Sequence, residues 1–177
     1  MKRLSRVAVV IMTVLLFGCG PTAQEKQKWE SFKSHVVIAD ARYRFSFSQV
    51  RKILSSAAEY GDDAMLSAVR QSNLSVWIKT AKEGAQEIAG AEEDFSWLYA
   101  NSKEVPPSIK SDLYRFKEIV DANARFIQDC QNGRIPVEST KSWVDDMNKY
   151  ESVYQSVHLE VKKVFTKQKW DFSEWRT

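Results

Sequence analysis

Residues 29–60 read WESFKSHVVIADARYRFSFSQVRKILSSAAEY, and the spacing of their apolar side chains decides the fold class. Side chains three and four residues apart form one continuous series: Trp29, Phe32, Val36, Ala39, Tyr43, Ser46, Val50, Ile53, Ala57 and Tyr60. Ser46 interrupts this series with a hydroxyl. Because steps of three and four residues return to the same face of an α-helix, the stretch predicts one long helix with a single buried stripe.

The same seven-residue rhythm continues in three later parts of the chain. In the second part its members are Leu74, Trp77, Ala81, Gly84, Ile88, Ala91, Phe95 and Leu98. In the third they are Ile109, Leu113, Phe116, Val120, Asn123, Ile127 and Cys130. In the fourth they are Thr140, Trp143, Met147, Tyr150, Tyr154, Val157, Val161 and Val164. Such a rhythm is typical of long helices packed at shallow angles, and Asn123 is expected to be a polar core residue that sets the register.

Glycine and proline residues separate these segments. Gly61 ends the first, Pro106 and Pro107 precede the third, and Gly133 with Pro136 precedes the fourth. Glycine is common directly after a helix, and proline is common in its first turn. The predicted helical segments are therefore residues 24–60, 62–101, 107–131 and 136–168.

These four segments predict an all-α fold. Because short links make sequential helices antiparallel, we expect an elongated antiparallel four-helix bundle with up-down-up-down connections. The rhythm loses phase from Gln71 to Asn73, so a kink or break is expected near residues 71–73. The third segment is much shorter than the first two. Part of the first or second segment is therefore expected to project beyond the bundle or to fold back on it.

The first eighteen residues differ from the rest of the chain. They begin with three basic residues, Lys2, Arg3 and Arg6, and continue with a largely apolar run at positions 7–17. That run is too short to cross a bilayer as a helix, which needs about 20 residues. With the sequence Leu-Phe-Gly-Cys at positions 16–19, the segment resembles the signal peptide and lipobox of bacterial lipoproteins. Phe17 departs from the smaller residue that is usual in that pattern.

The resemblance implies that the chain is cut before Cys19 and that the thiol and freed amine of Cys19 carry acyl chains. Several acyl chains together give stable membrane anchoring where one does not. Gly20 stands where aspartate commonly favours the inner membrane, so the resemblance favours the periplasmic face of the outer membrane. The resemblance and the periodic segments together divide the chain into a cleaved signal (1–18), a lipidated start and linker (19–23), the helical bundle (24–168) and an aromatic tail (169–177).

Removal of the signal also changes the charge balance. The chain has 26 basic and 23 acidic side chains, and three of the basic ones lie in the signal, which leaves 23 of each sign. A nucleic-acid partner requires a basic excess that neutralises phosphates. We therefore expect no nucleic-acid partner.

No pattern of catalytic or metal-binding residues is present. His35 and His158 are the only histidines, and neither belongs to an HExxH or ExxH pattern. No serine lies in a GxSxG or SxxK pattern. Cys130 lies on the third stripe and, with Cys19 acylated, has no disulfide partner in the chain. We expect a buried thiol at Cys130, and we expect neither enzymatic activity nor a metal or cofactor.

Two groups of residues are candidates for binding another protein. The first is on the predicted first helix, where Ile38 and Phe45 lie seven residues apart on the outer face beside Arg42 and Arg44. The second is in the tail and consists of Trp170, Phe172 and Trp175. Aromatic and arginine side chains are enriched in protein interfaces. The alternative for both groups is packing within the chain's own domain.

These observations predict a non-enzymatic, membrane-anchored protein that binds another envelope protein as an adaptor, assembly factor or inhibitor. The alternative is a bundle that binds a small apolar ligand between the second and fourth helices. That alternative depends on small side chains of the second helix lying opposite large ones of the fourth. The small residues are Ala81, Gly84, Ala85 and Ala91, and the large ones are Trp143, Tyr150 and Tyr154.

Overall fold

The computed structural model describes residues 21–60, 67, 73–103, 105–132 and 137–172, without the side chains of residues 53–60 and 137–142. Four helices account for most of these residues: α2 (Ala23–Tyr60), α4 (Leu74–Asn101), α5 (Ser108–Gln131) and α6 (Val137–Lys167). The described residues contain no β-strand. The all-α prediction is confirmed.

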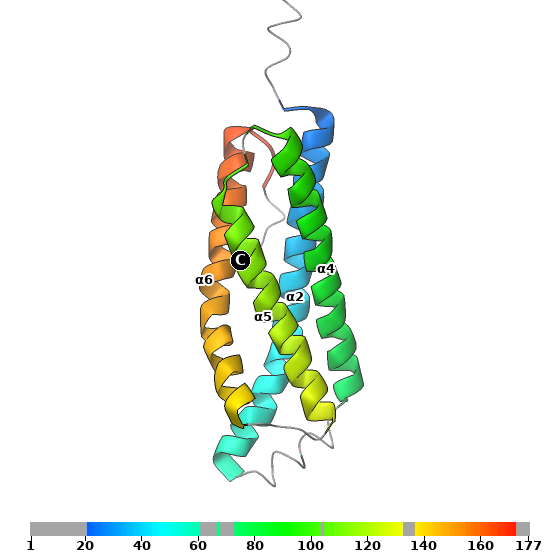
Figure 1. Cartoon of the computed structure of the whole chain (residues 1–177), viewed down its shortest axis with the longest axis vertical. Coiled ribbons are helices and arrows are strands. Elements are labelled where there is room, and N and C mark those ends of the chain that lie inside the picture. The colour runs from blue at the N-terminus through cyan, green and yellow to red at the C-terminus, as the bar shows by residue number, and fades with distance from the viewer. Residues whose placement is uncertain (1–20, 61–66, 68–72, 104, 133–136, 173–177) are drawn as a thin grey trace, which may run out of the picture.

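The four helices run up and down alternately along one long axis (Figure 1). Helices α2 and α5 descend from the end of the bundle that holds the start of α2, and α4 and α6 return to it. The predicted elongated antiparallel bundle with up-down-up-down connections is therefore confirmed. The C-terminal end of α2 extends beyond the neighbouring ends of the other three helices (Figure 1), as the unequal segment lengths predicted.

The second helix is shorter than the predicted segment. The prediction was a helical segment over residues 62–101 with a kink or break near residues 71–73, and α4 begins at Leu74 with Asn73 as its N-cap. Asn73 forms no side-chain capping bond to the helix, and its Oδ1 atom instead accepts a hydrogen bond of 2.7 Å from the Ser75 hydroxyl. A helix boundary therefore lies at Asn73, and Gln71 and Ser72 lie outside the described residues.

Local interactions define the helix ends at the opposite end of the bundle. Thr22 caps α2 by accepting a hydrogen bond of 3.0 Å from the backbone N–H of Glu25. The Glu25 carboxylate accepts a hydrogen bond from the Ser102 hydroxyl, directly after α4. The start of α2 is thereby held to the end of α4.

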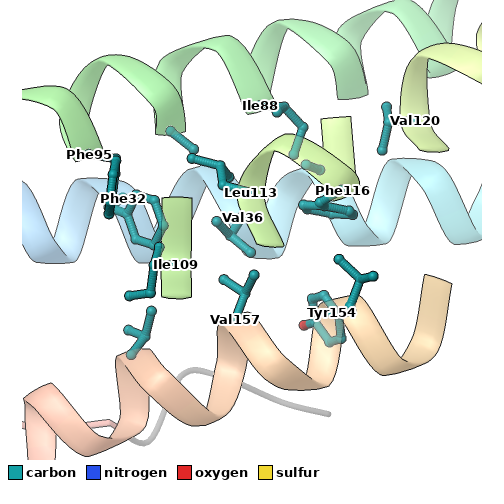
Figure 2. Packing of buried hydrophobic residues seen from close by; sticks show 14 of the residues in the cluster. Phe32, Val36, Ile88, Phe95, Ile109, Leu113, Phe116, Val120, Tyr154 and Val157 are labelled. Atoms are coloured by element: carbon teal, nitrogen blue, oxygen red, sulfur yellow. The ribbon is translucent and has the colours of Figure 1, made fainter. Parts of the chain in front are cut away.

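The core consists of two hydrophobic clusters along the bundle axis. The larger contains side chains from all four helices, among them Phe32, Val36, Ile88, Phe95, Leu113, Phe116, Tyr154 and Val157 (Figure 2). The smaller contains Val50, Leu74, Ile78, Ala81, Phe126, Ile127, Cys130 and Trp143. Except for the half-buried Trp77 and Met147, every described member of the predicted stripes is buried. Ile53, Ala57, Tyr60 and Thr140 lie outside the described side chains.

A buried polar group lies between the two clusters. The side-chain amide of Asn123 donates a hydrogen bond of 2.8 Å to the Ser46 hydroxyl, and its oxygen accepts one of 3.2 Å from the Trp143 indole. The Ser46 hydroxyl in turn donates to the backbone carbonyl of Tyr43 at 2.9 Å. Asn123 therefore joins α2, α5 and α6, in agreement with its predicted role as a polar core residue.

The small side chains of α4 do not lie opposite the large ones of α6. A Cβ atom added to Gly84 would lie 3.4 Å from the Cβ of Arg42 on α2 and 3.8 Å from Val120 on α5. Helices α4 and α6 lie on opposite sides of the bundle in Figure 1. The predicted pairing of these two helices is wrong, because the space beside the small face of α4 is occupied by α2 and α5.

Candidate partner-binding surface

The candidate surface is the face of α2 that points away from the core. Ile38 and Phe45 retain 36% and 46% of their accessible surface, which confirms their predicted outward position. Between Gln27 and Ser48 the stripe that contains them is uncharged, and the next position along it is Lys52; the uncharged members are Gln27, Ser31, Ser34, Ile38, Ala41, Phe45 and Ser48. We call these seven residues the outer stripe of α2. An exposed stripe of this length without charge resembles the core of a protein interface, where charged residues are depleted.

Ion pairs between α2 and α4 line one edge of the outer stripe. The Arg42 guanidinium binds the Glu83 carboxylate, and Lys28 binds Asp94 at 2.6 Å. Between them, Nδ1 of His35 lies 2.7 Å from Glu87. Each basic side chain on this edge therefore has a carboxylate of α4 as its partner.

Gly90 is the reason that His35 can occupy its place. A Cβ atom on Gly90 would lie 2.7 Å from the His35 ring, which is closer than side chains pack. The absence of that atom lets the imidazole lie flat against α4 and reach Glu87. His35 is half-buried between the two helices.

Arg44 lines the other edge of the outer stripe, towards α6. Its guanidinium donates to Asp40 at 2.8 Å and to Glu151 at 2.9 Å. It also lies over the ring of Tyr150, at 5.5 Å from the ring centroid. Burial acts to lower the pKa of Arg44, but the hydrogen bond and charge of Asp40 outweigh it and raise the pKa. Arg44 is therefore a permanently charged link between two helices, and 46% of its side chain remains exposed.

Asp40 also binds the buried hydroxyl of Tyr150. Burial raises the pKa of Tyr150, and the negative charge of Asp40 raises it further, so the phenol stays protonated and donates. This contact across the α2–α6 interface was not predicted. The four-residue spacing of Asp40 and Arg44 indicated an ion pair on α2, but nothing in the sequence indicated Tyr150 as the third member.

The tail folds back on the bundle instead of extending from it. Lys169 has a φ of 56°, and the backbone N–H of Trp170 donates to the carbonyl of Phe165 at 2.9 Å. The N–H of Lys169 donates to Thr166 at 3.1 Å. Together these bonds form a Schellman motif, which ends the helix and reverses the chain.

The reversal places two tail aromatics against the bundle. Trp170 packs edge-on against Phe165, and Phe172 lies 5.4 Å from the rings of both Phe165 and His158. Both tail aromatics are half-buried. The packing alternative therefore describes Trp170 and Phe172 better than a free binding surface does, whereas Trp175 lies outside the described residues.

The Cys130 thiol is buried. Burial raises the pKa of the Cys130 thiol to about 11, so the thiolate that reacts with electrophiles is suppressed at neutral pH.

Within the described part of the chain, no three His, Cys, Asp or Glu side chains are grouped to hold a metal ion. Among the described helices, none has both the length and the hydrophobicity needed to cross a membrane. Cys19, the predicted lipidation site, lies outside the described residues.

Comparison with family models, curated proteins and solved structures found no match for this chain.

Proposed function

We propose that this chain is a lipid-anchored envelope protein that binds another envelope protein through the outer stripe of α2. The observation that carries the proposal is the exposure of Ile38 and Phe45 in an uncharged stripe flanked by Arg42 and Arg44. Exposed apolar side chains beside arginine are characteristic of contact surfaces, because such residues dominate binding energy. In this role the protein acts as an adaptor, assembly factor or inhibitor and not as an enzyme.

The anchor part of the proposal rests on the resemblance of the first nineteen residues to a lipoprotein signal. Helix α2 begins at Ala23, only a few residues after Cys19. Acyl chains on Cys19 would therefore hold the end of the bundle that contains the start of α2 and the end of α6 close to the membrane (Figure 1). The proposed location is the periplasmic face of the outer membrane.

The anchor is tested by mass spectrometry of the mature N-terminus. We expect the wild-type chain to begin at Cys19 with acyl chains attached, and Cys19→Ser to yield an unacylated protein that leaves the membrane fraction. An unmodified Cys19 in the wild type would remove the anchor from the proposal.

The contact surface is tested with Phe45→Ala and with Leu159→Ala as the matched control. Leu159 is similarly exposed, at 51%, but lies on α6. Truncation of an interface hot spot costs about 2 kcal/mol, or roughly thirtyfold in affinity. We expect Phe45→Ala to lose that much affinity for the partner captured from envelope extracts, with an unchanged melting temperature, while Leu159→Ala keeps full affinity. Equal affinity of both variants would rule out the outer stripe as the contact surface.

A further inference from the structure

Large and small side chains are arranged along the outer stripe in a regular order. The two large members, Ile38 and Phe45, are seven residues apart. The small members Ser34, Ala41 and Ser48 follow a second seven-residue series, which is offset by three and begins at Gln27. In a heptad repeat, Ile38 and Phe45 therefore occupy one position, and Ser34, Ala41 and Ser48 occupy the other. Ser31 occupies the same heptad position as Ile38 and Phe45, one heptad before Ile38.

This order is complementary to itself when one helix is reversed. With two α2 helices antiparallel and a two-fold axis level with residues 39 and 40, Ile38 lies opposite Ala41 of the second copy. Phe45 then lies opposite Ser34, and Ser31 lies opposite Ser48. Every large side chain meets a small one, which is how neighbouring helices fill space evenly.

A parallel arrangement would not fill space evenly. It would place Phe45 against Phe45 and Ile38 against Ile38, which forces the helices apart. It would also place Ala41 against Ala41, between the levels of Ile38 and Phe45. Because the larger side chains hold the two helices apart, a gap would remain between the two alanines. The side-chain sizes therefore favour the antiparallel arrangement.

Charges beside the outer stripe agree with the antiparallel arrangement. Glu30, which binds Lys33 at 2.7 Å and keeps 37% of its side chain exposed, would lie beside the exposed Arg51 of the second copy. His35 would approach Arg42 of the second copy, but each already binds a carboxylate of α4, Glu87 and Glu83 respectively. The arrangement therefore brings Glu30 and Arg51, which have opposite charges, together at its ends. At its centre, His35 and Arg42 each already have a carboxylate partner.

We propose that the outer stripe of α2 binds a second copy of this chain, with the two α2 helices antiparallel. The inference rests on the contact surface of the proposed function. The antiparallel pair places the starts of its two α2 helices at opposite ends, so both Cys19 anchors reach one membrane only when the pair lies along its surface. The inference names the partner that this surface fits best, because an isologous interface requires a surface that is complementary to itself.

Cysteine cross-linking of the full-length acylated chain in detergent tests the arrangement. Ser31→Cys and Ser48→Cys are prepared separately with tags of different size, and a disulfide requires Cα atoms within about 7 Å. In the antiparallel pair Ser31 meets Ser48, whereas the two Ser31 positions lie roughly 25 Å apart. We expect an S31C–S48C product when the two variants are mixed and none when either is oxidised alone. Ser152→Cys, on the exposed side of α6, is the matched control and should cross-link with neither.

Sedimentation of the wild type and of Phe45→Arg measures whether the pair forms. We expect the wild type to sediment as a dimer and Phe45→Arg as a monomer with unchanged helical content. Cross-linking of S31C to itself would show a parallel pair and overturn the proposal, and so would a wild type that sediments only as a monomer. If the wild type is a monomer while Phe45→Ala still loses an envelope partner, the proposed function stands without the dimer. If the wild type is a monomer and Phe45→Ala keeps its affinity for envelope proteins, both the dimer and the proposed contact surface are wrong.

Discussion

At the scale of single residues, Gly90 shows how one missing methyl group determines where a neighbouring side chain lies. Glycine within a helix costs about 1 kcal/mol relative to alanine. A Cβ atom at position 90 would overlap the His35 imidazole. Glycine at this position therefore permits the contact between His35 and Glu87, and that contact offsets the cost of the glycine.

The first prediction concerns this pair. Gly90→Ala in the wild type should give little gain in the free energy of unfolding, because the added Cβ displaces His35 from Glu87. In a His35→Ala background the same substitution should stabilise the protein by about 1 kcal/mol, the gain expected from helix propensity alone. Urea unfolding of the four proteins in this cycle checks the result. Equal gains in both backgrounds would show that the ring does not need the space.

The second prediction concerns His158. Burial lowers its pKa, and the positive charge of Lys162 lowers it further. The folded protein therefore binds the proton less well than the unfolded chain, whose histidine has a pKa of about 6.5. It follows that stability is fully present above that pH and declines as the pH falls through the pKa of the folded state.

His158→Gln should remove the part of the stability loss at low pH that protonation of His158 causes. The measurement is the free energy of unfolding of wild type and variant between pH 7.5 and 5, a window spanning roughly one unit or more on each side of the unfolded pKa. We expect the wild type to lose more stability across it than the variant. Parallel curves for the two proteins would contradict the prediction, and Leu159→Ala serves as a control for nonspecific changes nearby.

At the scale of helices, side-chain size decides which neighbours approach closely. Helix α4 presents Ala81 and Gly84 towards the core, and Gly84 lies in contact distance of the α2 backbone. Helices α2 and α6 instead meet through stacked aromatic rings, with Tyr43 and Tyr150 at a centroid distance of 3.8 Å. The bundle therefore combines a close pair of helices, α2 and α4, with a more widely spaced pair, α2 and α6.

The third prediction tests the close pair. Ala81 is 1% exposed, so Ala81→Trp should overpack the smaller cluster and lower the free energy of unfolding by about 1–3 kcal/mol or more. Lys82→Trp, at the adjacent exposed position, is the control and should leave stability nearly unchanged. Guanidinium unfolding curves of both variants check this. Unchanged stability of Ala81→Trp would show unfilled space at the site and would contradict the close packing described here.

At the scale of the whole molecule, one polar group connects three helices between two hydrophobic clusters. Asn123 satisfies the hydroxyl of Ser46 on α2 and the indole of Trp143 on α6. A buried group of this kind favours one register of the helices, because a shift along the axis would leave its partners without hydrogen bonds.

The fourth prediction follows from that arrangement. Asn123→Ala leaves the Trp143 indole unpaired and should lower the free energy of unfolding by about 2 kcal/mol or more, since an unsatisfied buried donor costs about 1–3 kcal/mol. The triple variant Ser46→Ala, Asn123→Leu and Trp143→Phe removes all three polar groups and should recover most of the loss. Thermal unfolding followed by circular dichroism provides the measurement. A triple variant no more stable than Asn123→Ala would contradict this account.

The sequence alone determined the class of fold and most of the core. Steps of three and four residues are a property of a single helix, so the buried stripes of α2, α4, α5 and α6 could be read without knowledge of their neighbours. Glycine and proline marked the ends because they act through the local backbone. The outward position of Ile38 and Phe45 followed from the same periodicity.

Only the tertiary structure decided which helices face one another and which charges meet. Periodicity shows that Gly84 and Tyr150 both lie inward, but it does not show that Gly84 meets α2 and α5 and that Tyr150 meets Asp40. The prediction for Trp170 and Phe172 was uncertain for the same reason, since a reversal at Lys169 returns them to the bundle. Contacts between distant segments depend on the packing of the whole chain, and a pattern within one helix carries no information about the direction in which its neighbours lie.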